Sequence, residues 1–531
     1  MERSETVATC QRSGNISRRL RFCYVKKGIV LLKDPEPPST VLRTRLLEAF
    51  REHRFLLAAF LIPLCIRAIP EILVGPYPVG WDTIAFYVPN TLDWATGRLG
   101  WVALLGTAPL LYMISVPVYL MTRANPVWIF KIMGPILYGG LILALYRFLR
   151  LGLRWTERMS LGAGLMTSLY FVTLRISWDL YRNMFGLTFI LLSLPLFGSL
   201  KEPRSQLLLA GLVVLAVASD QLTGVVALSL IGARALVQIL GKRWDEFVTL
   251  MKVGGPGLLF FLLVAYAGVI LPGGSLVQQQ ASVPGLDSVV SSAGFLGYIY
   301  LPIAPLVFLG LRRIANTDLR NWTVVLLGLA LTALVPLSGF IVMGYRWSLL
   351  LDIPLCIYAS AGIARISGAG RPIINWSGLA RGKILPMFSM ILLVSAALYI
   401  VVPAQNAMLY YTSFPGFLPT SMVQDSAPLS DMASLRAALS WVATQMGPRD
   451  VLITHQAIYG WARAYLPSSD KIIDYGYSNP LGGVSLAQSQ GFSSIWTVWW
   501  VPSLGWHGQA YLPTGFVTVF QNGDIAVYTY H

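Results

Sequence analysis

A single acidic residue stands out just after the first long apolar segment of the chain. Asp82 is the only acid in residues 76–90, an apolar and aromatic run that opens with proline and glycine. Proline and glycine at these positions predict a tight turn just before the acid. A carboxylate can act as a general base towards a hydroxyl group or can ligate Mg²⁺ or Mn²⁺. Acids at the edge of an apolar segment often have such a role, and the simpler alternative is a solvated loop residue.

A second cluster of charged residues follows at residues 178–183, which contain Asp179 and Arg182, and Arg175 lies just before them. If the cluster lies on the same side of a membrane as Asp82, the two carboxylates could serve one site. Guanidinium groups bind phosphate through paired hydrogen bonds, so both arginines are candidates for an anion site. The alternative is that they extend from helix ends towards water.

A third charged position is Arg346, in the sequence Gly-Tyr-Arg-Trp. The run that follows it is largely apolar as far as Asp352. A charge in such a place needs a partner, and a phosphate group would be one.

The composition predicts a membrane protein with many spans. The chain has 531 residues, of which 55% are hydrophobic and 12% charged, and its mean hydropathy is +0.62. Soluble domains carry about 25% charged residues. Long apolar segments recur between Phe55 and Val402. The net charge of +16 is typical of cytoplasmic loops that fix orientation. Nucleic-acid binding is not expected, because the basic residues are scattered and no aromatic-basic module is present.

The distribution of arginine and lysine predicts the topology. The basic tail of residues 1–54, with an amphipathic helix at 41–50 on the membrane surface, should be cytoplasmic. Residues 101–120 are expected to be interfacial or re-entrant, because a crossing there would place an arginine-rich loop outside and because Pro109 and Pro117 interrupt them. The first outer loop then covers residues 75–125. About eleven spans result, with the N-terminus inside and the C-terminus outside. The expected spans are 55–74, 127–146, 159–174, 185–200, 206–218, 223–240, 257–271, 294–311, 322–337, 349–363 and 384–402.

A small α/β domain is predicted after residue 403, where the composition changes. Residues 430–446 and 456–466 read as helices, the first capped by Ser430 or Asp431. Strands are expected at 450–454, 471–474, 494–500, 516–520 and 525–530. The chain therefore consists of a basic cytoplasmic tail (1–54), a transmembrane domain (55–403) and an extracytoplasmic domain (404–531), in the cell membrane.

Three motifs follow one another along the chain: Gly80-Trp81-Asp82 with Tyr87, Trp178-Asp179 through Arg182-Asn183, and Tyr345-Arg346-Trp347 with the residues up to Pro354. In the order, spacing and sidedness of these motifs, the chain resembles the GT-C glycosyltransferases, which include protein mannosyltransferases, aminoarabinose transferases and single-subunit oligosaccharyltransferases. The resemblance covers most of the chain from about Arg54. Two departures separate the chain from the named branches. Thr83 follows Asp82 where protein mannosyltransferases have a second acid, and Val501 follows Trp499-Trp500 where oligosaccharyltransferases have an aspartate.

This resemblance implies a reaction. A sugar would move from a polyprenyl-phosphate donor to a glycan, lipid or protein acceptor outside the cytoplasm, with inversion at the sugar. Membrane lipids are the other expected partners. A divalent cation, Mg²⁺ or Mn²⁺, is the only cofactor considered, held by the two catalytic acids. The implied roles are: Asp82 as the base and Asp179 as the second catalytic acid; Arg346, Arg182 and Arg175 on the donor phosphate; Trp81, Tyr87 and Asn183 on the substrate.

Two other classes remain open. The first is a transporter or lipid flippase with an accessory outer domain, although no internal repeat is visible and the charges lie at membrane edges. The second is a non-catalytic scaffold, which would need neither acid. Several conspicuous residues have plainer interpretations: Asp220 as a turn residue, Asp93 and Asp287 as loop acids, His455 in capping or packing, and Trp496, Trp499, Trp500 and Trp506 as sugar-stacking or interface residues.

Overall fold

The structure is a computed structural model that comprises two compact units, Met1–Leu57 and Ala58–His531. Most of the described chain is helical, and strands occur in its N-terminal and C-terminal parts. The residues that the structure describes are 9–11, 20–25, 28–33, 38–270, 289–332, 344–366, 386–398, 427–466, 471–476, 479–502 and 512–531.

The N-terminal unit contains a small antiparallel sheet that the sequence analysis does not predict. Its strands are β1 (Thr9–Gln11), β2 (Leu20–Val25) and β3 (Gly28–Lys33), in the order β1-β2-β3. Helix α1 (Pro38–Leu73) follows. Residues 41–50 belong to this longer helix rather than to a separate one, because no proline or glycine interrupts the chain between Ser39 and Ile62.

Five helical segments of the described chain are long and apolar enough to cross a membrane, and two bent pairs raise the number to seven if each pair is one span. The bent pairs are α6 (Glu157–Leu169) with α7 (Phe171–Asp179), at 69°, and α12 (Val289–Tyr300) with α13 (Ala304–Leu311), at 75°. The five segments are His53–Leu73 in α1, Pro126–Leu151 (α5), Gln221–Leu240 (α10), Trp244–Ala267 in α11 (Trp244–Ile270), and Arg346–Ile366, which joins α15 (Gly344–Leu350) to α16 (Asp352–Ile366).

The other helices of this region are shorter. As expected, residues 101–120 form no uninterrupted helix, since α3 ends at Gly106 and α4 begins at Leu110, after Pro109. The second expected interruption is wrong, because Pro117 lies inside α4 and does not end it. These shorter elements are the π-helix η1 (Thr83–Tyr87), α2 (Val88–Ala95), α3 (Trp101–Gly106), α4 (Leu110–Thr122), α8 (Tyr181–Ser193), the 3-10 helix η2 (Leu194–Ser199), α9 (Pro203–Ser219), α14 (Thr317–Leu331) and the helix Pro386–Leu398.

The expected spans 159–174 and 185–200 leave residues 175–183 as a short outer loop between them, and this expectation is wrong. Arg175 and Asp179 lie on α7, and α8 begins at Tyr181, so Leu180 is the only residue between the two helices. Residues 171–191 therefore belong to two consecutive helices packed inside the bundle, and most of their side chains are buried. The charged motif is presented by a helix end and not by a flexible connection.

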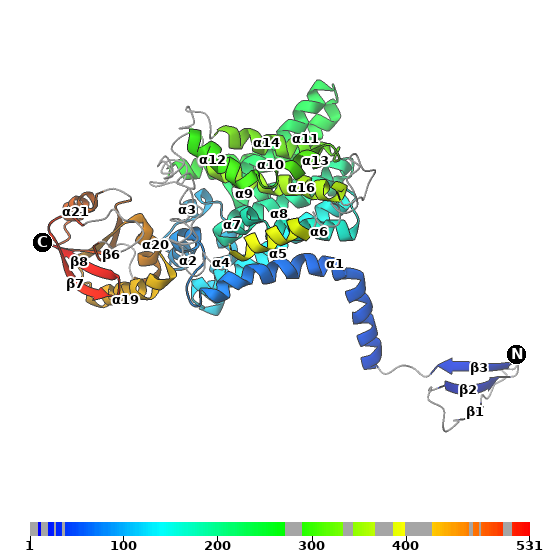
Figure 1. Ribbon diagram of the computed structural model, residues 1–531, viewed down its shortest axis with the longest axis horizontal. Coiled ribbons are helices and arrows are strands. Elements are labelled where there is room, and N and C mark those ends of the chain that lie inside the picture. The colour runs from blue at the N-terminus through cyan, green and yellow to red at the C-terminus, as the bar shows by residue number, and fades with distance from the viewer. Residues whose placement is uncertain are drawn as a thin grey trace, which may run out of the picture. The chain divides into compact units, whose positions relative to one another are not determined.

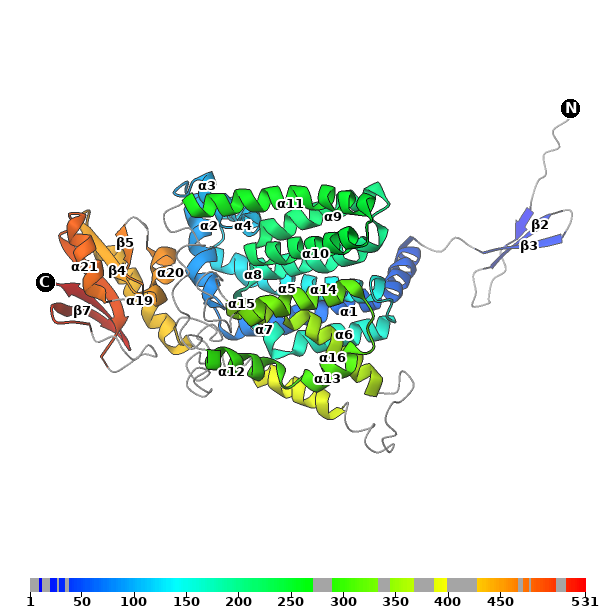
Figure 2. The same ribbon diagram turned by 90° about the horizontal axis from the view of Figure 1, so that it is seen from above.

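The C-terminal part forms the predicted α/β domain. Its five-stranded sheet has the order β5-β4-β6-β8-β7; β4 pairs in parallel with β5 and β6, and β8 pairs antiparallel with β6 and β7. Figures 1 and 2 show this domain at one end of the helical bundle. Its elements are α19 (Leu429–Gln445), β4 (Asp450–Thr454), α20 (Gln456–Tyr465), β5 (Ile472–Asp474), α21 (Pro480–Ser489), β6 (Ser494–Trp500), β7 (Phe516–Asn522) and β8 (Ile525–Tyr530).

The sequence located most of these elements but not all of their details. Strands β4, β6 and β8 have the predicted bounds, whereas α21 was not predicted, because Gly482 and Gly483 lower its helix propensity. The predicted cap of α19 is wrong: Pro428 occupies the N-cap position, and Asp431 instead accepts a hydrogen bond from the Trp500 indole at 2.8 Å.

Candidate active site

The structure brings the three charged motifs of the sequence together. Arg346 of α15 donates from Nη2 to Oδ2 of Asp82 at 2.9 Å, across 264 positions of the chain. The backbone N–H of Asp82 donates to Oδ2 of Asp179 at 3.3 Å. Asp82 and Asp179 are both buried. The two acids and the arginine that the sequence singled out therefore form one cluster.

Gly80 makes the approach of the two acid-bearing segments possible. Its φ is +94°, a conformation that residues with a side chain rarely adopt. A Cβ atom at Gly80 would lie 2.3 Å from Cβ of Asp179 and 2.7 Å from the carbonyl oxygen of Trp178. Glycine is therefore required both by the turn before Asp82 and by the contact with the end of α7.

Asp82 itself is the N-cap residue of the π-helix η1, which begins at Thr83. Single π-helical turns occur frequently at functional sites, where they redirect side chains. At the other end of η1, Tyr87 is buried in an aromatic cluster, with its ring centroid 5.5 Å from that of Tyr181 and 5.7 Å from that of Phe130. This packing fixes the short helix on α5 and α8. Tyr87, expected on the substrate, is 2% exposed.

Arg175 pairs with Asp179 one turn later on α7. Both side chains are buried, so Arg175 does not extend into water at a helix end. Its guanidinium neutralises the second acid of the cluster. A ligand would reach Arg175 less readily than Arg346, whose side chain is 15% exposed.

Three charged residues that support this cluster were missed by the sequence analysis. Arg67 of α1 donates to the carbonyl oxygens of Ser177 (2.8 Å) and Trp178 (3.1 Å), at the C-terminal end of α7. Arg67 also pairs with Glu71 at 2.7 Å, and Glu71 pairs with Lys131 at 2.9 Å. Charged residues inside apolar segments are costly and usually functional, and this signal was available at all three positions.

Lys131 extends this support to the turn that carries Asp82. Its ammonium group donates to the carbonyl oxygen of Tyr77 at 2.9 Å and to that of Glu71 at 2.7 Å. Residues 76–90, which contain Asp82, are called the acid loop. The start of the acid loop is thus tied to the first turns of α5, while Arg67 ties α1 to α7.

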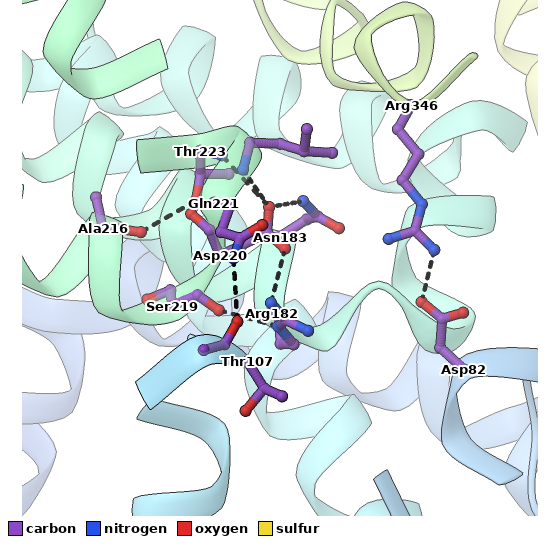
Figure 3. A network of polar contacts seen from close by, with 12 residues as sticks. Asp82, Thr107, Arg182, Asn183, Ala216, Ser219, Asp220, Gln221, Thr223 and Arg346 are labelled. Carbon is purple, nitrogen blue, oxygen red and sulfur yellow. Dashed lines mark hydrogen bonds and ion pairs between the residues drawn. The ribbon is translucent and has the colours of Figure 1, made fainter. Parts of the chain in front are cut away.

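Arg182 and Asn183 belong to a neighbouring group centred on Asp220 (Figure 3). Nη2 of Arg182 lies 3.6 Å from Oδ2 of Asp220, and the side-chain amide of Asn183 donates to Oδ1 of Asp220 at 2.8 Å. Asp220 also accepts from the backbone of Leu222, at 2.9 Å, and so caps α10. The turn role expected for Asp220 is confirmed. Asn183, expected on the substrate, is 1% exposed and engaged with this cap.

The electrostatics of the cluster favour an anionic ligand. Burial raises the pKa of the Asp82 carboxyl above its ordinary value and the nearby Asp179 adds to the rise, whereas Arg346, Arg175 and Arg182 oppose it. The paired groups comprise four bases and three acids, a net charge of +1: Arg67, Lys131, Arg175 and Arg346 against Glu71, Asp82 and Asp179.

The two acids do not form a metal site in this arrangement. Within the described residues, no group of three or more His, Cys, Asp or Glu side chains is placed to hold a metal ion. Asp82 and Asp179 are each paired with a guanidinium group, which would repel a dication.

The outer face of the acid loop packs against the C-terminal domain. The Arg463 guanidinium of α20 pairs with Asp93 and donates to Asn90 at 2.9 Å. The interpretation of Asp93 as a loop acid is wrong, because it lies on α2, is buried, and pairs with Arg98 as well, at 3.4 Å. Trp81, expected on the substrate, packs against the hydrophobic core of the C-terminal domain.

The remaining residues of interest are structural or lie outside the description. His455 accepts from the backbone N–H of Ala457 through Nδ1 at 3.1 Å, which confirms the capping role. Trp499 and Trp500 are buried in the C-terminal core. Asp287, Trp506 and the side chain of Tyr345 lie outside the described residues.

Comparison with known proteins gives no further information about this geometry. No protein-family model matches the chain, and no curated protein matches it either.

Proposed function

We propose that the chain is a membrane glycosyltransferase of the GT-C type, which moves a sugar from a polyprenyl-phosphate donor to a hydroxyl acceptor outside the cytoplasm. The observation that carries the proposal is the contact between Arg346 and Asp82. It joins a group suited to bind phosphate to a group suited to take a proton, within one buried cluster of net positive charge.

The proposed step is a single displacement. Asp82 takes the proton of the acceptor hydroxyl while the acceptor oxygen attacks the anomeric carbon of the donor. The bond from that carbon to the phosphate oxygen breaks, and the polyprenyl phosphate leaves with the electron pair. One displacement inverts the configuration at the sugar. The leaving group is already an anion, so it needs positive charge rather than a proton.

Arg346 and Arg182 supply this positive charge. Their side chains are 15% and 19% exposed, whereas those of Arg175 and Arg67 are 3% and 0% exposed. A phosphate can accept two parallel hydrogen bonds from one guanidinium. Donor binding would therefore draw Arg346 from Asp82 and leave the carboxylate ready for the acceptor. Asp179 holds the backbone of Asp82 in place and orients the acceptor.

The arrangement of the helices supports the orientation in the membrane. Helix α5 has 26 residues, a length of about 39 Å, which exceeds the hydrocarbon core of a bilayer. Lys131, near its start, contacts the acid loop. The arginine-rich connection 150–158 follows its end, so the basic residues and the acids lie at opposite ends of one span. The positive-inside rule then places the acids outside.

The eleven-span architecture is part of the proposal. Seven spans follow from the long helices and the bent pairs. The four further spans are formed by α8 with η2, by α9, by α14 and by the helix Pro386–Leu398.

The experiment uses the purified full chain in lipid nanodiscs with a panel of radiolabelled polyprenyl-phosphate sugars. The proposal predicts release of polyprenyl phosphate and transfer of label to an acceptor, with strong loss in Asp82→Asn. The same donors in liposomes distinguish the alternative class, because a flippase moves the intact lipid across the bilayer without breaking the sugar–phosphate bond. Movement without cleavage would replace the proposal by that alternative.

A further inference from the structure

Helix α20 of the C-terminal domain packs directly on the π-helix η1, which begins immediately after Asp82. Gly460, in the middle of α20, faces this contact. A Cβ atom at Gly460 would lie 2.3 Å from the carbonyl oxygen of Ile84 and 2.6 Å from Cα of Ala85. These are backbone atoms of η1, which cannot move aside as a flexible side chain would. The two helices therefore touch backbone to backbone, and only glycine permits the contact.

The hydrophobic core of the C-terminal domain includes part of the acid loop. Ile84 of η1 is 1% exposed and belongs to the same buried cluster as Ile458 and Trp461 of α20. The ring of Trp461 also lies 6.5 Å from that of Tyr77, at the start of the loop. The loop is thus covered on its outer side by a folded domain that begins more than three hundred residues later in the chain.

A charged contact fixes the adjoining helix. Arg463, one turn after Gly460, pairs with Asp93 and donates to the side chain of Asn90. Both partners lie on α2, which continues directly from η1. The side chains of the ion pair are largely buried: Arg463 is 11% and Asp93 6% exposed. Breaking a buried pair is destabilising, because the remaining charge loses its buried partner. Among its described charged partners, Asp93 would then keep only Arg98, which lies 3.4 Å away and whose side chain is 32% exposed.

We propose that α20 clamps the acid loop, and that Gly460 and Arg463 are positioning residues that set the place of Asp82 for the reaction. The inference rests on the proposed function for its catalytic consequence, but the clamp itself does not depend on it. Asp82 is held from the inner side by Asp179 and Arg346 and from the outer side by the packing of η1 on α20. With the outer support loosened, the carboxylate remains near the donor arginine but loses its fixed position towards the acceptor.

The first measurement needs no substrate. Hydrogen–deuterium exchange is followed for peptides covering residues 83–95 in the full-length wild type, Gly460→Ala, Arg463→Gln and Arg463→Lys. Gly482→Ala is the matched control, because Gly482 is exposed on α21 of the same domain and an added Cβ meets nothing within 4 Å. Exchange of residues 83–95 should rise at least about tenfold in Gly460→Ala and Arg463→Gln. It should stay unchanged in Gly482→Ala and recover in part in Arg463→Lys.

The second measurement separates positioning from loss of folded protein. The turnover rate, donor affinity and donor stoichiometry are measured for the same variants. The clamp predicts a fall in turnover of about tenfold or more in Gly460→Ala and Arg463→Gln, with donor affinity within about twofold and full stoichiometry. Peptides of β4, β6 and β8 should keep wild-type protection, which shows that the domain itself is folded. If Gly460→Ala does not fold, the comparison of Arg463→Gln with Arg463→Lys decides on the clamp.

Wild-type exchange at residues 83–95 together with wild-type turnover in both variants would overturn the clamp. Lower donor stoichiometry in proportion to the lost turnover would also overturn it, since misfolding would then explain the result. If the wild type transfers no sugar from any donor, the proposed function fails, and the exchange measurement alone decides on the clamp.

Discussion

Arg346 Nη2 lies 2.9 Å from Asp82 Oδ2, so the two residues to which we assign the main roles in the proposed reaction are partners of each other. The guanidinium and the carboxylate each lower the free-energy cost of burying the charge of the other. In the proposed reaction, a donor phosphate would compete for Arg346 before Asp82 could turn to an acceptor. The contact would then set the order of binding, because Asp82 would be released only where the donor is already bound.

The first prediction concerns the base. Asp82→Asn keeps the shape of the side chain and can still accept a hydrogen bond from Arg346, but it cannot take a proton. Turnover should fall by about 10²–10⁴-fold, the usual contribution of general base catalysis. Donor affinity, measured by equilibrium binding, should stay close to that of the wild type. Normal turnover in a folded, donor-binding Asp82→Asn protein would assign the base to another group, with Asp179 next to be tested.

The second prediction concerns Arg346. Arg346→Gln removes the charge that meets the donor phosphate, so donor affinity should fall by about tenfold or more. It also removes a group that lowers the pKa of Asp82, so the pKa of this carboxyl should rise further. A base acts only when deprotonated, and the acidic limb of the turnover–pH profile should therefore move to higher pH. Arg204→Gln, at an exposed position, is the control. An unchanged affinity and pH profile would reduce Arg346 to a structural residue.

The main residues of the candidate site were predictable because their surroundings in the sequence are unusual. Asp82 and Arg346 are charges in apolar runs, and such positions need partners. Their mutual contact was not predictable from local pattern, since it spans 264 positions. The same reason hid the support from Arg463, which lies 370 positions from Asp93. Arg67, Glu71 and Lys131 could have been noticed as charges inside spans, but their partners follow only from helix packing.

The helices and strands were predicted best where the hydrophobic pattern of a segment and the turn residues at its ends indicate the same element. Alternating or continuous apolar runs between turn residues gave the bounds of β4, β6 and β8. Hydropathy found the apolar segments but not the 69° break between α6 and α7, because no proline or glycine stands at that junction. The 75° bend between α12 and α13 does have a local signal, Pro302. The π-helical turn of η1, in contrast, has no local signal. It depends on packing against α5 and α20.

The third prediction concerns sidedness. Single cysteines replace Thr96 in the acid loop region, Gln488 in the C-terminal domain and Arg243 between α10 and α11, all exposed positions, in a background without the four native cysteines. A membrane-impermeant maleimide added to intact cells should label the first two. Arg243→Cys should react only after permeabilisation, because the positive-inside rule places it in the cytoplasm. Labelling of Arg243→Cys alone in intact cells would reverse the orientation and exclude an extracytoplasmic reaction.

The fourth prediction concerns the buried ion pairs beneath the cluster. Glu71 lies between Arg67, at 2.7 Å, and Lys131, at 2.9 Å. Glu71→Gln leaves two buried cations without an anion, so the free energy of unfolding should fall by about 3–5 kcal/mol. Glu157→Gln is the control, since its pair with Arg150 is 3.8 Å long and its side chain is 46% exposed. The control should change the free energy by less than about 1 kcal/mol. Equal effects would show that the buried pairs add no special stability.

The last prediction concerns the stability of the C-terminal domain as a function of pH. Burial lowers the pKa of His455 from 6.5 to about 4. Its Nδ1 accepts the N–H of Ala457 at the start of α20, and its ring lies 4.8 Å from Trp499 and 5.9 Å from Tyr475. Protonation would place a hydrogen on the capping nitrogen and a charge between these rings.

The sign of the effect follows from proton binding. Between pH 6.5 and about 4 the unfolded chain binds a proton at His455 that the folded chain does not, so stability falls as the pH falls through this range. The loss should be on the order of 2–3 kcal/mol for this group. His455→Asn keeps a side-chain oxygen for the cap but does not titrate. The melting temperature of the full chain, followed by tryptophan fluorescence, should therefore fall less steeply on acidification in His455→Asn than in the wild type. Parallel curves for the two proteins would contradict the assignment and show that folding does not lower the pKa of His455.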